Sequence, residues 1–167
     1  MNDTLQVRDA CRADREAITA IYNQGIEDRI ATFETRLRDP ADIAHWFEGR
    51  YPCVVVTKGG TLIAFASTST YRPRECYDGI AEFSVYAARE ARGLGAGRAA
   101  MLGLQAAARK AGFYKLISRV FPENTASLRL LDSLGFTEVG VYHRHGRLDG
   151  VWRDVVIVEK LLDDENL

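Results

Sequence analysis

Residues 92–98 read Arg92-Gly93-Leu94-Gly95-Ala96-Gly97-Arg98 and join an apolar strand expected at 80–86 to an alanine-rich helix expected at 97–111. Three alternating glycines let the backbone turn its N–H groups towards one point. The helix that begins there adds unpaired amides and the positive end of its dipole. Such a turn is a site for phosphate or pyrophosphate, to which Arg92 and Arg98 would add positive charge. The alternative is that the glycines only permit close packing of helix on strand.

Two common nucleotide motifs do not fit this turn. A P-loop requires Gly-Lys-Ser/Thr, whereas Gly97 is followed by Arg98 and Ala99. A Rossmann fingerprint that began at Gly93 would need glycine or alanine where Arg98 stands. It would also need an acidic residue about 20 positions on, and residues 116–118 include none. Both nucleotide interpretations therefore fail.

The order of the expected elements predicts the fold class. In chain order they are a strand at 5–8, a helix from Asp14 to near Gly25, a helix after Pro40, strands at 53–57, 62–70 and 80–86, the helix 97–111, a strand at 115–120, a helix at 124–134, and strands at 137–142 and 151–159. Gly59-Gly60 between two apolar strands is a strong hairpin signal. Hairpin-linked strands followed by strand–helix crossovers predict an α+β fold, with a mixed sheet covered by helices.

Length and composition exclude several classes of protein. A chain of 167 residues has the length of one domain, and we expect residues 1–167 to form one. A formal net charge of −1 argues against general affinity for nucleic acid or an anionic membrane. The longest apolar runs are too short to span a membrane, and the first residues do not resemble a signal peptide.

The cysteines and the basic residues give two further indications. Cys11, Cys53 and Cys76 are odd in number and lack metal-site spacing, which favours a reduced, cytoplasmic protein without a metal. His143 and His145 share a strand face but lack a nearby third ligand. Of 22 basic residues, 18 are arginine. Coding bias is the simple explanation, and forks for planar anions such as carboxylate or phosphinate are the alternative.

Two segments together resemble a known superfamily. The pattern Arg92-x-x-Gly95-x-Gly97 resembles the acyl-CoA pyrophosphate loop of the GNAT superfamily of N-acetyltransferases. The segment from Asn124-Thr125-Ala126-Ser127 to Leu134-Gly135-Phe136 resembles its second cofactor segment. The resemblance implies a mostly antiparallel seven-stranded sheet flanked by about four helices, with acetyl-CoA as cosubstrate. It implies a cofactor site formed by Val85, Tyr86, Arg92, Gly93, Leu94, Gly95, Ala96, Gly97, Arg98, Asn124 and Ser127.

The similarity extends to one family within that superfamily, from about Val7 to Leu161. It is carried by Ile26-Glu27, Thr32-Phe33-Glu34-Thr35, Tyr71-Arg72-Pro73-Arg74-Glu75-Cys76-Tyr77-Asp78 and Gly150-Val151-Trp152-Arg153-Asp154. These stretches resemble the phosphinothricin N-acetyltransferases, a family that includes enzymes acting on methionine sulfoximine and arsinothricin. The resemblance implies acetylation of the α-amine of a small anionic amino-acid analogue, resistance by detoxification, and a homodimer.

Glu82 matches the catalytic glutamate of that family. In the strand 80–86 it shares a face with Ile80, Ser84 and Tyr86. An amino group is mostly protonated at neutral pH, so a base must remove a proton directly or through water. A carboxylate among apolar residues should be partly desolvated, which favours its protonated form. The alternative is a glutamate that faces solvent or pairs with an arginine.

The usual general acid is missing from this sequence. Many GNAT enzymes carry a tyrosine near the thiolate where this chain has Leu131. The loss is tolerable because the thiol of CoA should have a pKa of about 8.5, which makes thiolate a fair leaving group. Backbone amides around Ser84 and Val85 would polarise the thioester carbonyl. Tyr22, Tyr77 and Tyr142 stay open as substitute acids.

A phosphinothricin-like substrate carries two anions and therefore requires two cationic sites. The loop before the strand 80–86 supplies Arg72, Arg74 and Tyr77 for its carboxylate, of which Arg74 and Tyr77 match the family more closely. Phe33 would pack on the methylenes, and Tyr142 or His143 would approach the distal end. The alternative is that these arginines are solvated and Phe33 belongs to the core.

Two other functions remain open. One is acetylation of another amine, such as a polyamine, an aminoglycoside or a protein N-terminus, although Arg72 and Arg74 argue against a cationic substrate. The other is a non-catalytic module that senses acyl-CoA. The absence of the tyrosine favours the sensing module, and the presence of Glu82 opposes it.

Overall fold

One sheet of seven strands, in the order β1-β2-β3-β4-β5-β7-β6, forms the centre of the computed structural model, which describes residues 4–162. The strands are β1 (Leu5–Asp9), β2 (Cys53–Lys58), β3 (Thr61–Thr70), β4 (Ile80–Ala87), β5 (Lys115–Val120), β6 (Thr137–Leu148) and β7 (Val151–Leu161). Neighbouring strands are antiparallel except for β4 and β5, which run parallel. The expected mixed, mostly antiparallel sheet is confirmed.

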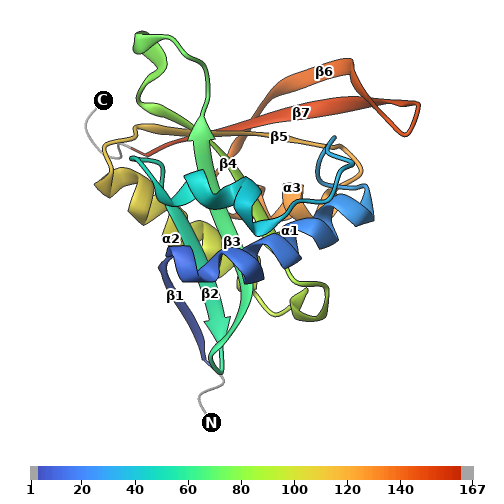
Figure 1. Ribbon diagram of the computed structural model, residues 1–167. Helices are drawn as coiled ribbons and strands as arrows, with labels where there is room; N and C mark the ends of the chain where they lie inside the picture. The colour runs from blue at the N-terminus through green and yellow to red at the C-terminus, as the bar shows by residue number, and fades with distance from the viewer. Residues whose placement is uncertain (1–3, 163–167) are drawn as a thin grey trace.

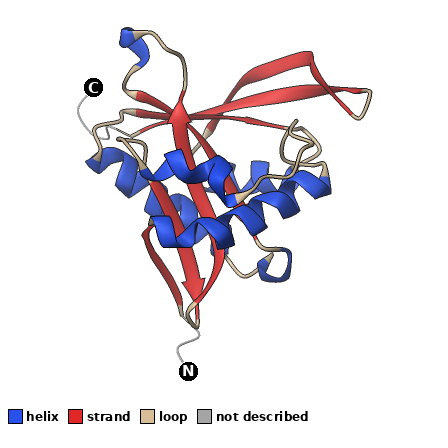
Figure 2. Ribbon diagram, viewed as in Figure 1, coloured by secondary structure: helices blue, strands red, loops and turns tan. Residues whose placement is uncertain are grey.

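Helices cover both faces of this sheet. The α-helices are α1 (Arg15–Asp28), α2 (Ala96–Lys110) and α3 (Thr125–Ser133), and 3₁₀ helices span Arg12–Asp14, Pro40–Phe47, Glu75–Tyr77 and Arg89–Ala91. The helix expected after Pro40 is thus a 3₁₀ helix. In Figures 1 and 2, α1 and the helix Pro40–Phe47 lie in front of the sheet, and α2 lies behind it. The central strands are therefore covered on both sides.

The burial of the strands follows from this two-sided cover. Val54, Val55 and Val56 of β2 are all buried, because α2 packs on this strand and the three valines belong to the same core cluster as Ile43 of the helix Pro40–Phe47. Phe65 of β3 and Leu104 of α2 are fully buried in the same core. A continuous apolar run, rather than alternation, is what a strand covered on both faces requires.

The expected end of the first helix near Gly25 is wrong, because α1 continues to Asp28. The helix ends at Arg29, whose φ of 57° places it in the left-handed region. Gly25 is buried against the ring of Tyr86, where an added Cβ would lie 2.5 Å from Cε1. This glycine therefore serves the close packing of α1 on β4 rather than a helix stop.

The last two strands form a longer hairpin than expected. β6 was expected to end at Tyr142, but it runs to Leu148 and turns at Asp149-Gly150, both with positive φ. Its pairing with β7 shifts register between Tyr142 and Gly146. Figure 1 shows this hairpin projecting from the rest of the sheet. Its irregular part carries side chains towards the candidate site.

Candidate active site

β4 and β5 diverge immediately after Glu82. Their parallel pairing runs from Ile80↔Lys115 to Glu82↔Ile117. Beyond it, the hydroxyl of Ser118 donates a hydrogen bond of 2.8 Å to the carbonyl of Phe83. The main-chain groups of Phe83 therefore face β5, and those of Val85 face the same side by alternation. The amide of Val85 is thus directed into the space between the diverging strands.

A narrow cavity of about 40 Å³ occupies this divergence, and we call it the strand gap. Its lining includes Ser84 and Val85 of β4, Ser118 and Arg119 of β5, and Leu131 of α3. Leu131 is buried and forms an apolar wall there. Of the candidate substitute acids Tyr22, Tyr77 and Tyr142, none lines the strand gap.

A second cavity of about 240 Å³, the aromatic cavity, lies beside the strand gap. Phe33 and Tyr22 line it together with Glu82, Ser84 and Arg119. Phe33 packs edge-to-face on Phe121, with ring centroids 4.8 Å apart. Burial raises the pKa of Tyr22, so its hydroxyl keeps its proton at neutral pH.

A third cavity of about 220 Å³, the hairpin cavity, also has Glu82 and Arg119 in its lining. Arg72 lines it from the loop before β4, with its guanidinium carbon 5.2 Å from the centroid of the Tyr71 ring. Tyr142 and His145 line it from β6 and stack with centroids 4.6 Å apart. The register shift in β6 lies between Tyr142 and Gly146, so His145 belongs to an irregular part of the strand, where the regular alternation of side chains is interrupted.

Glu82 is partly buried, as expected, and it is also paired with an arginine. Nε of Arg119 donates to Oε1 of Glu82 at 2.8 Å, and the two side chains are 56% and 22% exposed. The alternative expectation for Glu82, pairing with an arginine, is therefore met. Glu82 nevertheless lines two cavities, so the pairing leaves it accessible to a ligand.

The glycine turn borders the largest of these spaces, a cavity of about 460 Å³ that we call the loop cavity. Every predicted cofactor residue lines it except Leu94, which points outward and is half exposed. Gly93 and Gly95 have φ of 78° and 81°, which only glycine adopts freely. Within the described residues, no side chain caps α2 at Gly95. The first amides of α2 are thus left for an anion such as pyrophosphate.

The second cofactor segment forms the opposite wall of the loop cavity. Asn124 caps α3 by accepting a hydrogen bond from the amide of Ser127 at 3.3 Å. Leu130 packs close to Gly97, where an added Cβ would lie 3.3 Å from its Cδ2. The glycine therefore lets α2 and α3 approach each other beside the cavity.

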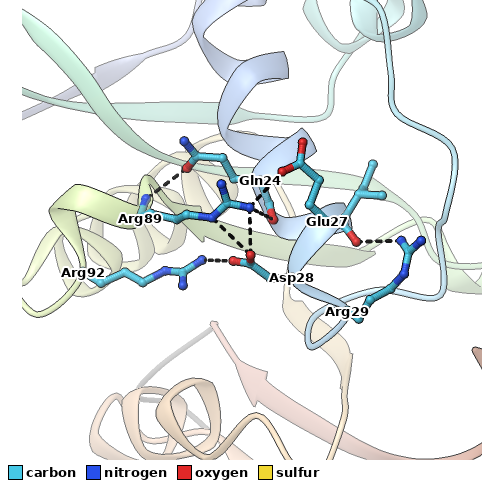
Figure 3. Close-up of polar contacts among 7 residues, drawn as sticks. Gln24, Glu27, Asp28, Arg29, Arg89 and Arg92 are labelled. Atoms are coloured by element: carbon cyan, nitrogen blue, oxygen red, sulfur yellow. Dashed lines mark hydrogen bonds and ion pairs between the residues drawn. The ribbon is translucent and has the colours of Figure 1, made fainter.

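Arg92 is held by the last turn of α1 (Figure 3). Its Nη2 lies 2.5 Å from Oδ2 of Asp28, and Oδ1 of Asp28 accepts from Arg89 at 2.8 Å. Arg89 also pairs with Glu27 at 2.9 Å. Hydrogen bonds from Arg89 and Arg92 lower the pKa of Asp28. Two carboxylates at a helix C-terminus oppose its dipole, and the arginines offset that cost.

Three predicted substrate residues lie outside the cavities beside Glu82. Tyr77 packs edge-to-face on Tyr71, with ring centroids 5.7 Å apart. His143 is largely exposed and its Nδ1 lies 3.3 Å from Asp154. Arg74 is exposed just before the 3₁₀ helix Glu75–Tyr77. The structure brings Phe33, Arg72 and Tyr142 to the site, and it does not bring these three.

Two residues of the site were not predicted, Arg119 and His145. Arg119 follows Ile117 by two positions on β5 and so shares its face, but only the register with Glu82 brings it to the site. Alternation within 137–142 does not predict the place of His145, because this residue lies within the irregular part of β6, between Tyr142 and Gly146.

Residues 4–162 contain neither a cluster of metal-binding side chains nor a helix that could span a membrane. In this range no three or more His, Cys, Asp or Glu side chains gather in a way that could hold a metal ion. No helix in the same range is long and apolar enough to cross a membrane.

Comparison with known proteins decides the family. Residues 18–136 match the model of the Acetyltransferase (GNAT) family. The chain is a GNAT acetyltransferase. It is 31% identical to the L-methionine sulfoximine/L-methionine sulfone acetyltransferase of Salmonella typhimurium over 96% of each chain. It is 35% identical to the phosphinothricin N-acetyltransferase of Alcaligenes faecalis, over 90% of this chain and 79% of that one.

A solved structure agrees with the fold of this GNAT acetyltransferase. A GNAT superfamily phosphinothricin acetyltransferase from Sinorhizobium meliloti, in complex with acetyl-CoA, superposes with a TM-score of 0.88. The two chains are 32% identical over 95% of this chain and 88% of the other. As a member of this family the protein is an acetyltransferase with acetyl-CoA as its cosubstrate. The loop cavity, with its uncapped helix and glycine turn, fits that cosubstrate.

Proposed function

We propose that this GNAT acetyltransferase acetylates the α-amine of a small anionic amino-acid analogue of the phosphinothricin, methionine sulfoximine or arsinothricin type. Acetylation would detoxify the analogue and confer resistance. The proposal rests on one observation: Glu82 lies where β4 and β5 diverge and lines both the aromatic and the hairpin cavity. Arginine side chains supply positive charge in both cavities. The names of the relatives from Salmonella typhimurium and Alcaligenes faecalis support the substrate class.

In the proposed mechanism each residue of the site has one task. Acetyl-CoA supplies the activated acetyl group. The amides of the glycine turn, with Arg92 and Arg98, hold its pyrophosphate. Glu82 would remove a proton from the substrate amine, directly or through water, within a direct ternary complex. The amine nitrogen would then bond to the thioester carbonyl carbon, and the C–S bond would break to release CoA as its thiolate. The amide of Val85 stabilises negative charge that develops on the acyl oxygen.

Leu131 supplies no proton in this mechanism. It closes the strand gap with an apolar wall, and the leaving thiolate does not require a strong acid. Tyr86 also lines the strand gap, but its ring is packed between Phe65 and Tyr22, and burial raises its pKa. The site therefore depends on a good leaving group rather than on a positioned acid.

The substrate would be held by residues from both sides of Glu82. Phe33 would pack on its methylenes from the aromatic cavity. Tyr142 would approach its distal end from the hairpin cavity, and Arg72, which the sequence assigned to the carboxylate, lines the same cavity and is reassigned to the distal anion. The assignment of Arg74, Tyr77 and His143 rests on family resemblance alone. A polyamine or aminoglycoside is disfavoured, because Arg72 and Arg119 would repel a second positive charge.

We also propose that the enzyme is a cytoplasmic homodimer. Cys11, Cys53 and Cys76 are all free thiols, which suits a reducing compartment. The projecting β6–β7 hairpin exposes large apolar side chains, and burying such a surface against a second copy would stabilise a dimer. They are Val139, Val141, Val151 and Trp152.

A thiol-release assay tests the proposed function. The purified enzyme is given acetyl-CoA with phosphinothricin, methionine sulfoximine or arsinothricin, beside Glu82→Gln and the control Glu16→Gln. Glu16 is an exposed carboxylate in the first turn of α1, far in sequence from the strand gap. We expect Glu82→Gln to lower kcat by about 100-fold or more and Glu16→Gln to act like wild type. Release no greater than that of Glu82→Gln with all three compounds would refute the substrate class and leave family membership intact.

A further inference from the structure

Arg119 occupies a position that no other cation shares among the described residues. It lines the strand gap, the aromatic cavity and the hairpin cavity, and it contacts Glu82 directly. Arg72 lines the hairpin cavity but neither of the other two. A ligand whose amine faces Glu82 therefore meets Arg119 first.

We propose that Arg119 binds the α-carboxylate of the substrate, so that Glu82 and Arg119 together recognise the zwitterionic end of an α-amino acid. This inference rests on the proposed function and adds a specificity-determining residue to it. Amine and carboxylate of an α-amino acid sit on one carbon, so opposite charges lie side by side. Glu82 and Arg119 present the complementary pair of charges, also side by side, at 2.8 Å.

The free donors of Arg119 suit a carboxylate. Its Nε is the atom bonded to Glu82, and a guanidinium carries further N–H donors in a planar fork. That fork matches the two oxygens of a carboxylate. The Arg119 side chain is 56% exposed, so a ligand can contact it without displacing buried residues.

The main chain beneath Arg119 is firmly placed. Arg119 pairs with Ile157 of β7, and its neighbour Ser118 bonds to the Phe83 carbonyl across the divergence. Arg119 and Glu82 therefore both project from strands of the sheet and not from a loop. A receptor on a fixed strand fixes the amine relative to Glu82, which the loop residue Arg74 would do less well.

The assignment separates the two anions of the substrate. Arg119 takes the carboxylate beside the amine, and Arg72, with its guanidinium over Tyr71, is left for the anion at the far end. An amine without an α-carboxylate gains nothing from Arg119 and competes with it for Glu82. The pair therefore favours free α-amino acids over simple amines.

Matched substrates test this inference. The values of kcat/KM are measured for methionine sulfoximine and for its α-carboxamide, and for methionine and methionine amide, with wild type, Arg119→Lys and Arg119→Gln. We expect wild type to prefer each acid over its amide by about 10- to 100-fold, the worth of one charge-assisted hydrogen-bonded contact. Arg119→Gln should reduce this ratio to within about threefold of unity, and Arg119→Lys should retain part of it.

Two controls separate recognition from a structural effect. Arg72→Gln should leave the acid-to-amide ratio unchanged while lowering the preference for phosphinothricin over methionine sulfone, whose distal group is uncharged. Arg129→Gln, at an exposed position on α3, should act like wild type. Circular dichroism and thermal melting confirm that each variant is folded.

The outcomes are distinct from those of the proposed function. Equal losses for acid and amide in Arg119→Gln, or an unchanged ratio, would overturn the assignment of Arg119. Absence of any acid preference in wild type, including no turnover of any α-amino acid, would overturn it as well. If methionine is acetylated with an Arg119-dependent acid preference while the toxic analogues are not, Arg119 stands and the proposed substrate class fails.

Discussion

The carboxylate of Asp28, in the last turn of α1, contacts the guanidinium of Arg92 beside the glycine turn, with Oδ2 and Nη2 2.5 Å apart. Arg89 binds the other oxygen of the same carboxylate. The two arginines therefore share one anchor and differ in one respect: Arg92 lines the loop cavity and Arg89 does not. This difference provides a matched test of the anion site.

Arg92→Gln should raise the KM for acetyl-CoA by about 3- to 10-fold and change kcat by less than about twofold. The reason is that a phosphate contact binds ground state and transition state alike. Arg89→Gln removes a guanidinium from the same carboxylate and should leave this KM within about twofold of wild type. Initial rates at varied acetyl-CoA measure both variants, and equal KM values for the two would contradict the role of Arg92.

Asp14 should make stability depend on pH. Two hydrogen bonds from Arg8 lower its pKa from 3.8 to about 2. Because the folded-state pKa is depressed, the stabilisation is complete above about pH 4 and is lost as the pH falls towards 2. Asp14→Asn should lower the free energy of unfolding at pH 7 by about 1–2 kcal/mol, since the half-exposed Arg8 weakens the pair.

Urea unfolding from pH 7 to pH 3 measures the effect of Asp14→Asn. The difference from wild type should shrink towards the acid end. Asp132→Asn, an exposed carboxylate on α3, serves as the control. A difference that stays constant across this range would show that the contribution of Asp14 is not electrostatic.

Gly25→Ala should destabilise the protein although alanine favours helices. The gain in helix propensity is at most about 1 kcal/mol. The new Cβ would lie 2.5 Å from the ring of Tyr86, which is itself packed against Phe65 and Tyr22. We expect a net loss of about 1–3 kcal/mol in the free energy of unfolding.

A double-mutant cycle with Tyr86→Ala isolates this contact. In the background without the ring, Gly25→Ala should become neutral or stabilising, because the helix propensity remains and the clash does not. Urea midpoints of the four proteins give the coupling. Additive effects would mean that the ring of Tyr86 is not what requires glycine at position 25.

Leu131 should tolerate an apolar substitution of similar volume. Leu131→Met should keep kcat within about threefold and cost less than about 1.5 kcal/mol, whereas Leu131→Ala should cost about 2–4 kcal/mol by opening a cavity in the core. Thiol release and urea unfolding measure the two effects. A large loss of kcat in a stably folded Leu131→Met would point to a role beyond that of an apolar wall.

Elements with local signals could be predicted from the sequence. Gly59-Gly60 specified a hairpin, and Asn124 and Gly135 bounded a helix, because turn and cap chemistry depends on neighbouring residues. Asp149-Gly150 is a turn signal of the same kind, and it marks the true end of β6, beyond the expected end at Tyr142. Gly25 suggested a helix end that is not there, because glycine at this position serves a tertiary contact with Tyr86 and not a local turn.

The candidate site also contains both residues with a local sequence signal and residues that only the tertiary structure brings there. All predicted cofactor residues except Leu94 line the loop cavity, because they lie in short contiguous motifs, whereas Gly25, Ile30 and Ala31, which also line it, come from a distant part of the chain and were not predicted. Arg119 depends on the register between two strands that are far apart in the chain, and His145 on an irregularity in β6. Neither the register between β4 and β5 nor the irregularity in β6 can be predicted from the local periodicity of the sequence.

The short parallel pairing of β4 and β5 makes the sheet a joint between two antiparallel halves, β1 to β4 and β5 to β6. Few main-chain bonds cross this joint, and Glu82 lies at its open end. A ligand that contacts both β4 and β5 would add interactions between the two halves, where few main-chain hydrogen bonds exist. Because catalysis takes place here, each turnover would include formation of the ligand contacts between the two halves and their loss when the products leave.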